Sequence, residues 1–247
     1  QLRVEAARLM GESVEPEFSS YLSQLIRTDE SASVVREALA SAAKGKYPGL
    51  VVETIAQLGN HGTKAAARQA LAQYGEMAVK PLRNALFDDR IARDHRLDIP
   101  RTLSKIHSQS AMNAVLAGLL EEDRSLRFQS ILALEEMARR FPDLPVDRQI
   151  IESAIVSDAM LYSQRFAIFF VLFAGVEQSS VGRTSLLRQA LIESMERVRE
   201  RTIWLLSLIY PPKDIRGIWG ALNSADAAKQ AYAVELLDNL LTGEVKR

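Results

Sequence analysis

A short pattern that recurs roughly every 32 residues constrains the fold of this 247-residue chain more than any other feature. In most copies an apolar or small residue precedes a basic residue, and an Ala/Leu-rich stretch follows. The basic residues are Arg3, Arg36, Arg68, Arg96, Arg127, Arg165, Arg199 and Lys229, at steps of 33, 32, 28, 31, 38, 34 and 30. Such a period is typical of repeat proteins, in which each repeat is one small supersecondary unit.

The segments between these copies also carry apolar residues at helical spacing, as Leu116, Leu119 and Leu120 do. They are 16–28, 50–58, 78–87, 111–120, 150–157, 186–195 and 214–222. Glycine and proline fall mainly between segments, at 11–16, 44–48, 59–62, 141–145 and 210–212. Pro100 lies inside an expected helix, so we predict that it kinks this helix or starts it. Since no stretch alternates with period two, each period is predicted to be a helix, a tight turn and an antiparallel helix.

A helix pair of about 33 residues cannot bury its apolar face alone, so neighbouring pairs must stack. We therefore predict an all-α fold, a right-handed α-solenoid of about seven helix pairs, as a single domain over residues 1–247. The opening helix, with Val4, Ala7, Leu9 and Met10, has the pattern of an interior repeat rather than of a polar cap. The chain is therefore expected to be a fragment of a longer protein.

The repeated arginines predict a structural ladder. An aspartate lies seven residues upstream of three of them, in Asp29/Arg36, Asp89/Arg96 and Asp158/Arg165. Side chains that recur once per repeat align along a stack, so they can form charge-assisted hydrogen bonds across repeats. The predicted ladder residues are Asp29, Arg36, Arg68, Asp89, Arg96, Arg127, Asp158, Arg165 and Arg199. A ligand-binding row of arginines is the alternative.

This arrangement, with aspartate in the turn and an apolar-Arg opening of an Ala/Leu-rich second helix, resembles the HEAT-repeat family. The resemblance is most faithful over 111–134 and 226–240 and weakens over 139–182, where the spacing stretches to 38. Three C-terminal runs, 196–201, 205–215 and 233–241, more narrowly resemble the soluble HEAT region of bacterial membrane proteins similar to ADP/ATP carriers. That resemblance implies a cytoplasmic regulatory or docking module, held at the cytosolic face of the inner membrane through the parent chain.

Composition argues against most catalytic chemistry. The chain has no cysteine and three well-separated histidines, which disfavours a thiolate or histidine metal site. Phosphate-loop and nucleophile-elbow patterns do not occur, and the carboxylate pairs are adjacent in sequence, so they diverge around a helix. We therefore expect no catalytic, metal or cofactor-binding residue. With 31 basic and 31 acidic residues the formal net charge is zero, so no nucleic-acid partner is expected.

The expected function is a non-catalytic scaffold for a protein partner or for neighbouring domains of the same chain. The candidate partner-binding residues are Arg197 and Arg201, in the densest basic cluster, and Trp219. A solvated face or core packing is the alternative for these side chains, and the cluster could also dock on an acidic partner or anionic lipid. The alternative functions are a HEAT-like DNA-binding enzyme of the alkylpurine glycosylase type and a stand-alone assembly scaffold.

The longest apolar run is Phe166–Val176, which is eleven residues long. A membrane-spanning helix needs roughly 20 residues, so no membrane insertion by this segment is expected. The run is predicted to be a fully buried core helix, with a membrane-surface or partner-docking patch as the alternative.

Overall fold

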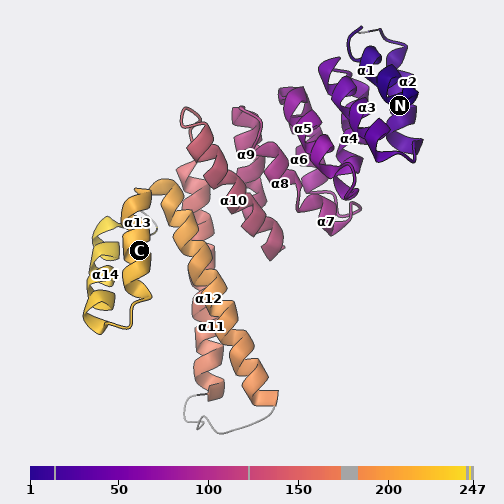
Figure 1. Cartoon of the computed structure of the whole chain (residues 1–247). Helices are drawn as coiled ribbons and strands as arrows, with labels where there is room; N and C mark the ends of the chain where they lie inside the picture. The colour runs from indigo at the N-terminus through magenta and orange to yellow at the C-terminus, as the bar shows by residue number, and fades with distance from the viewer. Residues whose placement is uncertain (14, 122, 174–182, 243–244, 246–247) are drawn as a thin grey trace. The chain divides into compact units, whose positions relative to one another are not determined.

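A computed structural model of the chain describes residues 1–13, 15–121, 123–173, 183–242 and 245. In this part of the chain every regular element is a helix, which confirms the all-α prediction. The chain divides into two compact units, Gln1–Pro145 and Val146–Arg247. They run from indigo to dusky pink and from pink to yellow in Figure 1. The single domain over residues 1–247 stays a prediction.

Unit Gln1–Pro145 consists of short helices in two layers (Figure 1). In one layer, α1, α3, α5, α8 and α10 contact one another in succession, and in the other α2, α4, α6 and α9 do. The helices are α1 (Leu2–Met10), α2 (Phe18–Thr28), α3 (Ala32–Lys44), α4 (Val51–Ala56), α5 (Lys64–Tyr74), α6 (Glu76–Leu86), α7 (Arg93–Arg96), α8 (Ile99–Leu103), α9 (Gln109–Ala117) and α10 (Arg124–Arg140). Three 3-10 turns, η1 (Pro48–Leu50), η2 (Gln57–Gly59) and η3 (Gly118–Leu120), join them.

Leucines fill the core of this unit, and Leu39, Leu71 and Leu82 are completely buried. The helix ends follow local chemistry. Pro100 occupies the first turn of α8, so the expectation that it starts a helix is confirmed. The Asp123 carboxylate caps α10 by accepting hydrogen bonds from the amides of Ser125 and Leu126, at 2.8 and 3.3 Å.

Gly75 joins α5 directly to α6 with a φ of +62°, a backbone conformation that only glycine adopts freely. The predicted breaker segments 11–16, 44–48, 59–62 and 141–145 lie at or beyond helix ends, as expected.

Unit Val146–Arg247 is built differently. Its helices are α11 (Arg148–Phe173), α12 (Arg183–Ile209), α13 (Pro212–Leu222) and α14 (Ala227–Leu240). The first two are 26 and 27 residues long and pack against each other. Each replaces a predicted helix–turn–helix, because no glycine or proline interrupts 148–173 or 183–209. Asp158 therefore lies within α11 rather than in a turn, which corrects the expectation.

The apolar run that begins at Phe166 is another correction. Its described part, up to Phe173, is largely exposed: Phe170 is 61% and Val171 79% accessible. Residues 174–176 of the run lie outside the described residues. The prediction of a fully buried core helix is therefore wrong, because α11 projects beyond the side chains that could cover it. Among the described helices, α11 alone is long and apolar enough to cross a membrane, and only 17% of its apolar window is buried.

Candidate functional site

Side-chain bonds between separate elements of unit Gln1–Pro145 join residues that lie one sequence period apart. Among the described residues, the bonds that join positions more than about ten apart range from 26 residues, between Arg3 and Asp29, to 36, between His107 and Asp143. Others include Ser23–Glu53 at 30 residues and Ser104–Glu136 at 32. The Tyr47 hydroxyl also donates to the Glu15 carbonyl oxygen, 32 residues upstream. The period found in the sequence is therefore also the period of the polar contacts.

Ion pairs belong to this set. Arg3 Nη1 of α1 lies 2.7 Å from Asp29 Oδ2, whose side chain is almost completely buried between α2 and α3. Asp98, which precedes α8, contacts both Lys64 and Arg68 of α5, the latter at 3.9 Å. Burial and the charge of nearby Arg101 lower the pKa of the Arg68 guanidinium below its usual value. These pairs tie α1 to the residue that follows α2, and α5 to the residue that precedes α8.

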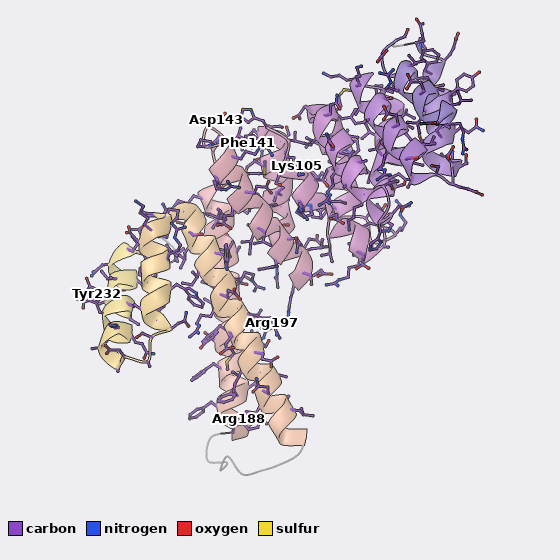
Figure 2. The ribbon with its side chains drawn as sticks, in the orientation of Figure 1. Lys105, Phe141, Asp143, Arg188, Arg197 and Tyr232 are labelled. Atoms are coloured by element: carbon purple, nitrogen blue, oxygen red, sulfur yellow. The ribbon has the colours of Figure 1, made fainter. Side chains whose placement is uncertain are left out.

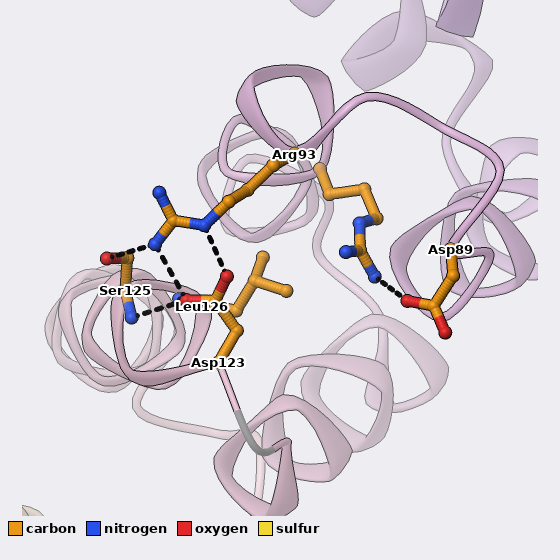
Figure 3. A network of polar contacts seen from close by, with 6 residues as sticks. Asp89, Arg93, Asp123, Ser125 and Leu126 are labelled. Carbon is orange, nitrogen blue, oxygen red and sulfur yellow. Dashed lines mark hydrogen bonds and ion pairs between the residues drawn. The ribbon is translucent and has the colours of Figure 1, made fainter.

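Figure 3 shows the most extensive of these contacts, between Arg93 of α7 and the residues that open α10. Arg93 Nη2 lies 2.9 Å from Asp123 Oδ1 and 2.6 Å from Ser125 Oγ, and Arg93 Nε also donates to Asp123. Asp123 thus caps α10 and binds Arg93 at the same time. The hydrogen bond from Arg93, helped by the capped amides, holds the pKa of the Asp123 carboxyl well below its usual range.

The structure brings together one of the three predicted Asp/Arg pairs. Arg96 Nη1 lies 2.7 Å from Asp89 Oδ1 in the same unit (Figure 3). Asp29 binds Arg3 instead of Arg36, and Arg36 is exposed, with its Nε donating to the Ala32 carbonyl oxygen of its own helix. Asp29 therefore binds the helix α1, which packs against α3, rather than an arginine of α3 itself. Arg127 lies half-buried in α10.

Asp158 and Arg201 form a buried ion pair between α11 and α12. Arg201 Nε lies 2.5 Å from Asp158 Oδ2, and Arg201 Nη2 donates to the other carboxylate oxygen. Both side chains are less than 10% exposed. Asp158 was predicted to pair with Arg165, which instead donates from Nη1 to the Ser194 carbonyl oxygen at 3.0 Å. Arg201 was a candidate partner-binding residue, but its burial assigns it to the interior of this helix pair.

The two other predicted binding residues lie on the surface of unit Val146–Arg247. Arg197 is exposed on α12 (Figure 2) and lies 3.8 Å from Glu193. Trp219 of α13 is half-buried beneath the Arg199 guanidinium, which lies 5.1 Å from the indole centroid. Arg199 also donates to Asn223 Oδ1 at 2.8 Å. Arg199 therefore ties α12 to α13 and forms a basic and aromatic surface with Trp219, whereas Arg197, two residues away on the same helix, points to a different side of α12.

Several contact residues were not singled out from the sequence. These residues are Lys64, Arg93, Asp98 and Asp123. A signal for them existed, since Lys64 and Asp98 are 34 residues apart and Arg93 and Asp123 are 30 apart. Searching for opposite charges one period apart would have found both pairs.

A smaller cluster lies after α10, where the His107 ring stacks on Phe141 at 4.7 Å between centroids. His107 Nε2 lies 2.8 Å from Asp143 Oδ2, and this hydrogen bond lowers the pKa of the Asp143 carboxyl. Figure 2 labels Phe141 and Asp143, with Lys105 in the same unit. The hydrogen bond between His107 and Asp143 is exposed, and it is one more contact between residues about one repeat apart in the sequence.

The polar groups described above bind one another rather than converge on a shared open space. Within the described residues, no group of three or more His, Asp or Glu side chains is placed to hold a metal ion. The arrangement is suited to holding helices in register and to presenting surfaces. No protein-family model matches the chain, and no curated protein matches it in sequence.

Proposed function

We propose that the chain is a HEAT-like right-handed α-solenoid that works as a non-catalytic interaction scaffold. The observation that carries the proposal is the sequence separation of 26 to 36 residues in the long-range side-chain bonds described in unit Gln1–Pro145. In a solenoid each repeat contacts only its neighbours, so tertiary contacts fall at one repeat length. The layered succession of α1, α3 and α5 beside α2, α4 and α6 supports the same interpretation.

The proposed partner is a protein segment or a neighbouring domain of the same longer chain. Stacked repeats offer an extended surface on which successive side chains repeat. Arg199 and Trp219 combine an exposed guanidinium with an aromatic ring, a combination enriched where proteins bind one another, and Arg197 is a second exposed guanidinium on α12. The resemblance noted in the sequence adds a context, a cytosolic module of a nucleotide-transporter-like membrane protein.

Deletion of one whole period tests the repeat architecture. Removing residues 32–63 takes out α3, η1, α4 and η2, so that α5 and α6 follow α2 directly. If the repeats stack, α5 replaces α3 against α1, and the shortened chain unfolds cooperatively. The matched control removes the same number of residues half a period out of phase, 48–79, and should fail to fold. Equal loss of folding in both variants would reject the solenoid.

Photo-crosslinking in the source cell tests the function. A photoreactive residue is placed at Arg197 or Trp219 in the full parent chain, with exposed Arg83 of α6 as the control position. A discrete protein adduct at 197 and 219, absent at 83, is the expected result. Adducts to nucleic acid would favour the DNA-binding enzyme. The absence of any adduct at 197 and 219 would remove this surface as the docking site.

A further inference from the structure

We propose that the free end of the α11–α12 helix pair inserts into the interface of an anionic lipid bilayer. This end, here called the apolar end, consists of Phe166, Ile168, Phe170, Val171, Leu172, Leu186 and Leu187. These side chains are between 47% and 79% exposed. The proposal does not depend on the solenoid, and it departs from the expectation that this segment avoids the membrane.

The distribution of apolar side chains around α11 favours lipid over a protein groove. Successive helical residues are rotated by about 100°, so Phe170, Val171 and Leu172 together point over roughly 200° of the circumference. A helix that docks in a protein groove carries one apolar stripe, whereas a helix that is apolar on most sides suits a surrounding apolar medium. A second copy of the chain would cover only one side of this end.

Burial separates α11 from the core helices of water-soluble proteins. Such core helices are as apolar as α11 but are mostly buried, whereas only 17% of the apolar window of α11 is buried. The helix begins at Arg148, far from the N-terminus, so a signal sequence does not explain it. The exposed apolar surface therefore calls for an external covering.

Charge sets the depth of insertion. The charge-free part of α11 from Phe166 to Phe173 is eight residues, about 12 Å of helix at 1.5 Å per residue. On α12 the charges resume at Glu193, followed by Glu196 and Arg197. A span needs about 30 Å, but interfacial helices bury their apolar face only about 5–10 Å deep. The apolar end fits the interface and is too short to cross by itself. Any 18-residue window of α11, the length that could cross, also contains Asp158 and Arg165, which bond to α12.

The sign of the charge selects the lipid. Among the described side chains of 166–173 and 186–192, Arg188 carries the only charge. Its guanidinium carbon lies 5.9 Å from the Phe169 ring centroid, so a cation lies within the apolar end (Figure 2). An arginine on a flexible stem can reach headgroup phosphates while its alkyl part stays with the acyl chains. Anionic headgroups complement this arrangement.

Vesicle flotation of the full 247-residue chain tests the proposal, with phosphatidylcholine vesicles containing or lacking phosphatidylserine. The chain should float with the anionic vesicles, and the Phe170→Ser/Val171→Ser variant should bind about 100-fold more weakly, because two large apolar side chains are lost. The matched control is Tyr232→Ser/Val234→Ser, two similarly exposed apolar residues on α14, which should float like the wild type. Arg188→Gln should reduce the preference for phosphatidylserine. Circular dichroism checks that each variant is folded.

A Phe170→Trp variant provides a second measurement. Its fluorescence, compared with that of the two native tryptophans alone, should shift to shorter wavelength with vesicles and be quenched by brominated acyl chains. Failure of the wild type to float, unchanged flotation of the Phe170→Ser/Val171→Ser variant, or no fluorescence shift would overturn the proposal. Self-association in solution that this variant abolishes, without vesicle binding, would also overturn it and would identify a second copy as the occupant.

Discussion

The two units of this chain differ in how far along the sequence their longest side-chain bonds reach. In Gln1–Pro145, side-chain bonds between elements join residues 26 to 36 apart. Val146–Arg247 also has a bond of this length, from Arg165 to Ser194 over 29 residues, but there Asp158 binds Arg201 over 43 residues, and Arg148 reaches the Tyr210 and Thr242 hydroxyls over 62 and 94. The first unit is tied neighbour to neighbour, whereas the second is closed by contacts from its beginning to its end.

The difference suggests how each unit responds to damage. Where contacts are limited to neighbours, stability is approximately a sum over repeats, and a local defect stays local. Where one ion pair joins two long helices, its loss should destabilise both helices along their length. The four predictions that follow test this contrast, from the largest effect to the smallest.

Loss of Arg201 should have the largest effect. Arg201→Met leaves the Asp158 carboxylate buried without its partner, which costs about 3–5 kcal/mol of unfolding free energy. Arg197→Met, one turn away and exposed, is the control and should change stability by less than about 0.5 kcal/mol. Urea denaturation measures both. Hydrogen exchange should show faster exchange along α11 and α12 together.

The double variant Asp158→Leu/Arg201→Met sharpens this test. Replacing both buried charges with apolar side chains removes the desolvation penalty, so stability should recover toward the wild-type value. A double variant as unstable as Arg201→Met alone would show that packing, rather than the unpaired charge, causes the loss.

The Gly11→Ala substitution, which adds a methyl group, should destabilise the contact between α1 and α3. A Cβ built on Gly11 lies 2.8 Å from Ser41 Cα, so backbone must move, at a cost of about 1–3 kcal/mol. Gly49→Ala is the control, since no atom lies within 4 Å of its added Cβ. Exchange should quicken in α1 to α3 and stay unchanged beyond α5. Spreading of the effect to α10 would contradict a neighbour-to-neighbour unit.

Two substitutions of Asp123 distinguish the contribution of its helix cap from the contribution of its charge. Asp123→Ala loses the cap of α10 and the pair with Arg93, which together cost about 1–2 kcal/mol. Asp123→Asn keeps a capping oxygen and should cost less. Because the folded pKa of Asp123 is depressed, its charge stabilises the fold above the ordinary carboxyl pKa of about 3.9 and ceases to do so as pH falls through the folded pKa.

The stability difference between wild type and Asp123→Asn should therefore shrink as the pH is lowered from about 5 toward about 2, a range that contains the ordinary pKa of an aspartate carboxyl. Urea denaturation at each pH measures this difference. A difference that stays constant over this range would mean that the Arg93 contact contributes nothing through charge.

The smallest and most local effect is expected at Asp88, where only the pKa of one carboxyl should change. Arg90 donates from Nε and Nη2 to the two Asp88 oxygens at 2.8 Å, and this lowers the pKa of Asp88 to about 2. Arg90→Gln should raise that pKa toward its ordinary value in an NMR titration, while the unfolding midpoint stays unchanged. A pKa that does not move would assign the shift to the Arg90 backbone amide instead.

The helices and their ends were largely predictable. Helices and their ends are decided by local chemistry that acts over a few residues. Here the local signals are the spacing of leucine and alanine, Pro100, and the breakers that contain glycine and proline. The period of about 32 was also visible, and the side-chain bonds in the first unit follow it. What the spacing could not show is which charge binds which, because Asp29 meets Arg3 only once α1 packs beside α3.

The second unit shows what the tertiary structure alone decided. The sequence around Asp158 and Arg201 carries the same Asp and Arg signals as the first unit, yet two long helices replace the predicted pairs and bury these charges together. The apolar run after Arg165 predicted a helix correctly but burial wrongly. A residue's own neighbours in sequence fix its helical conformation, whereas its exposure depends on whether another element arrives to cover it, and that is a property of the whole fold.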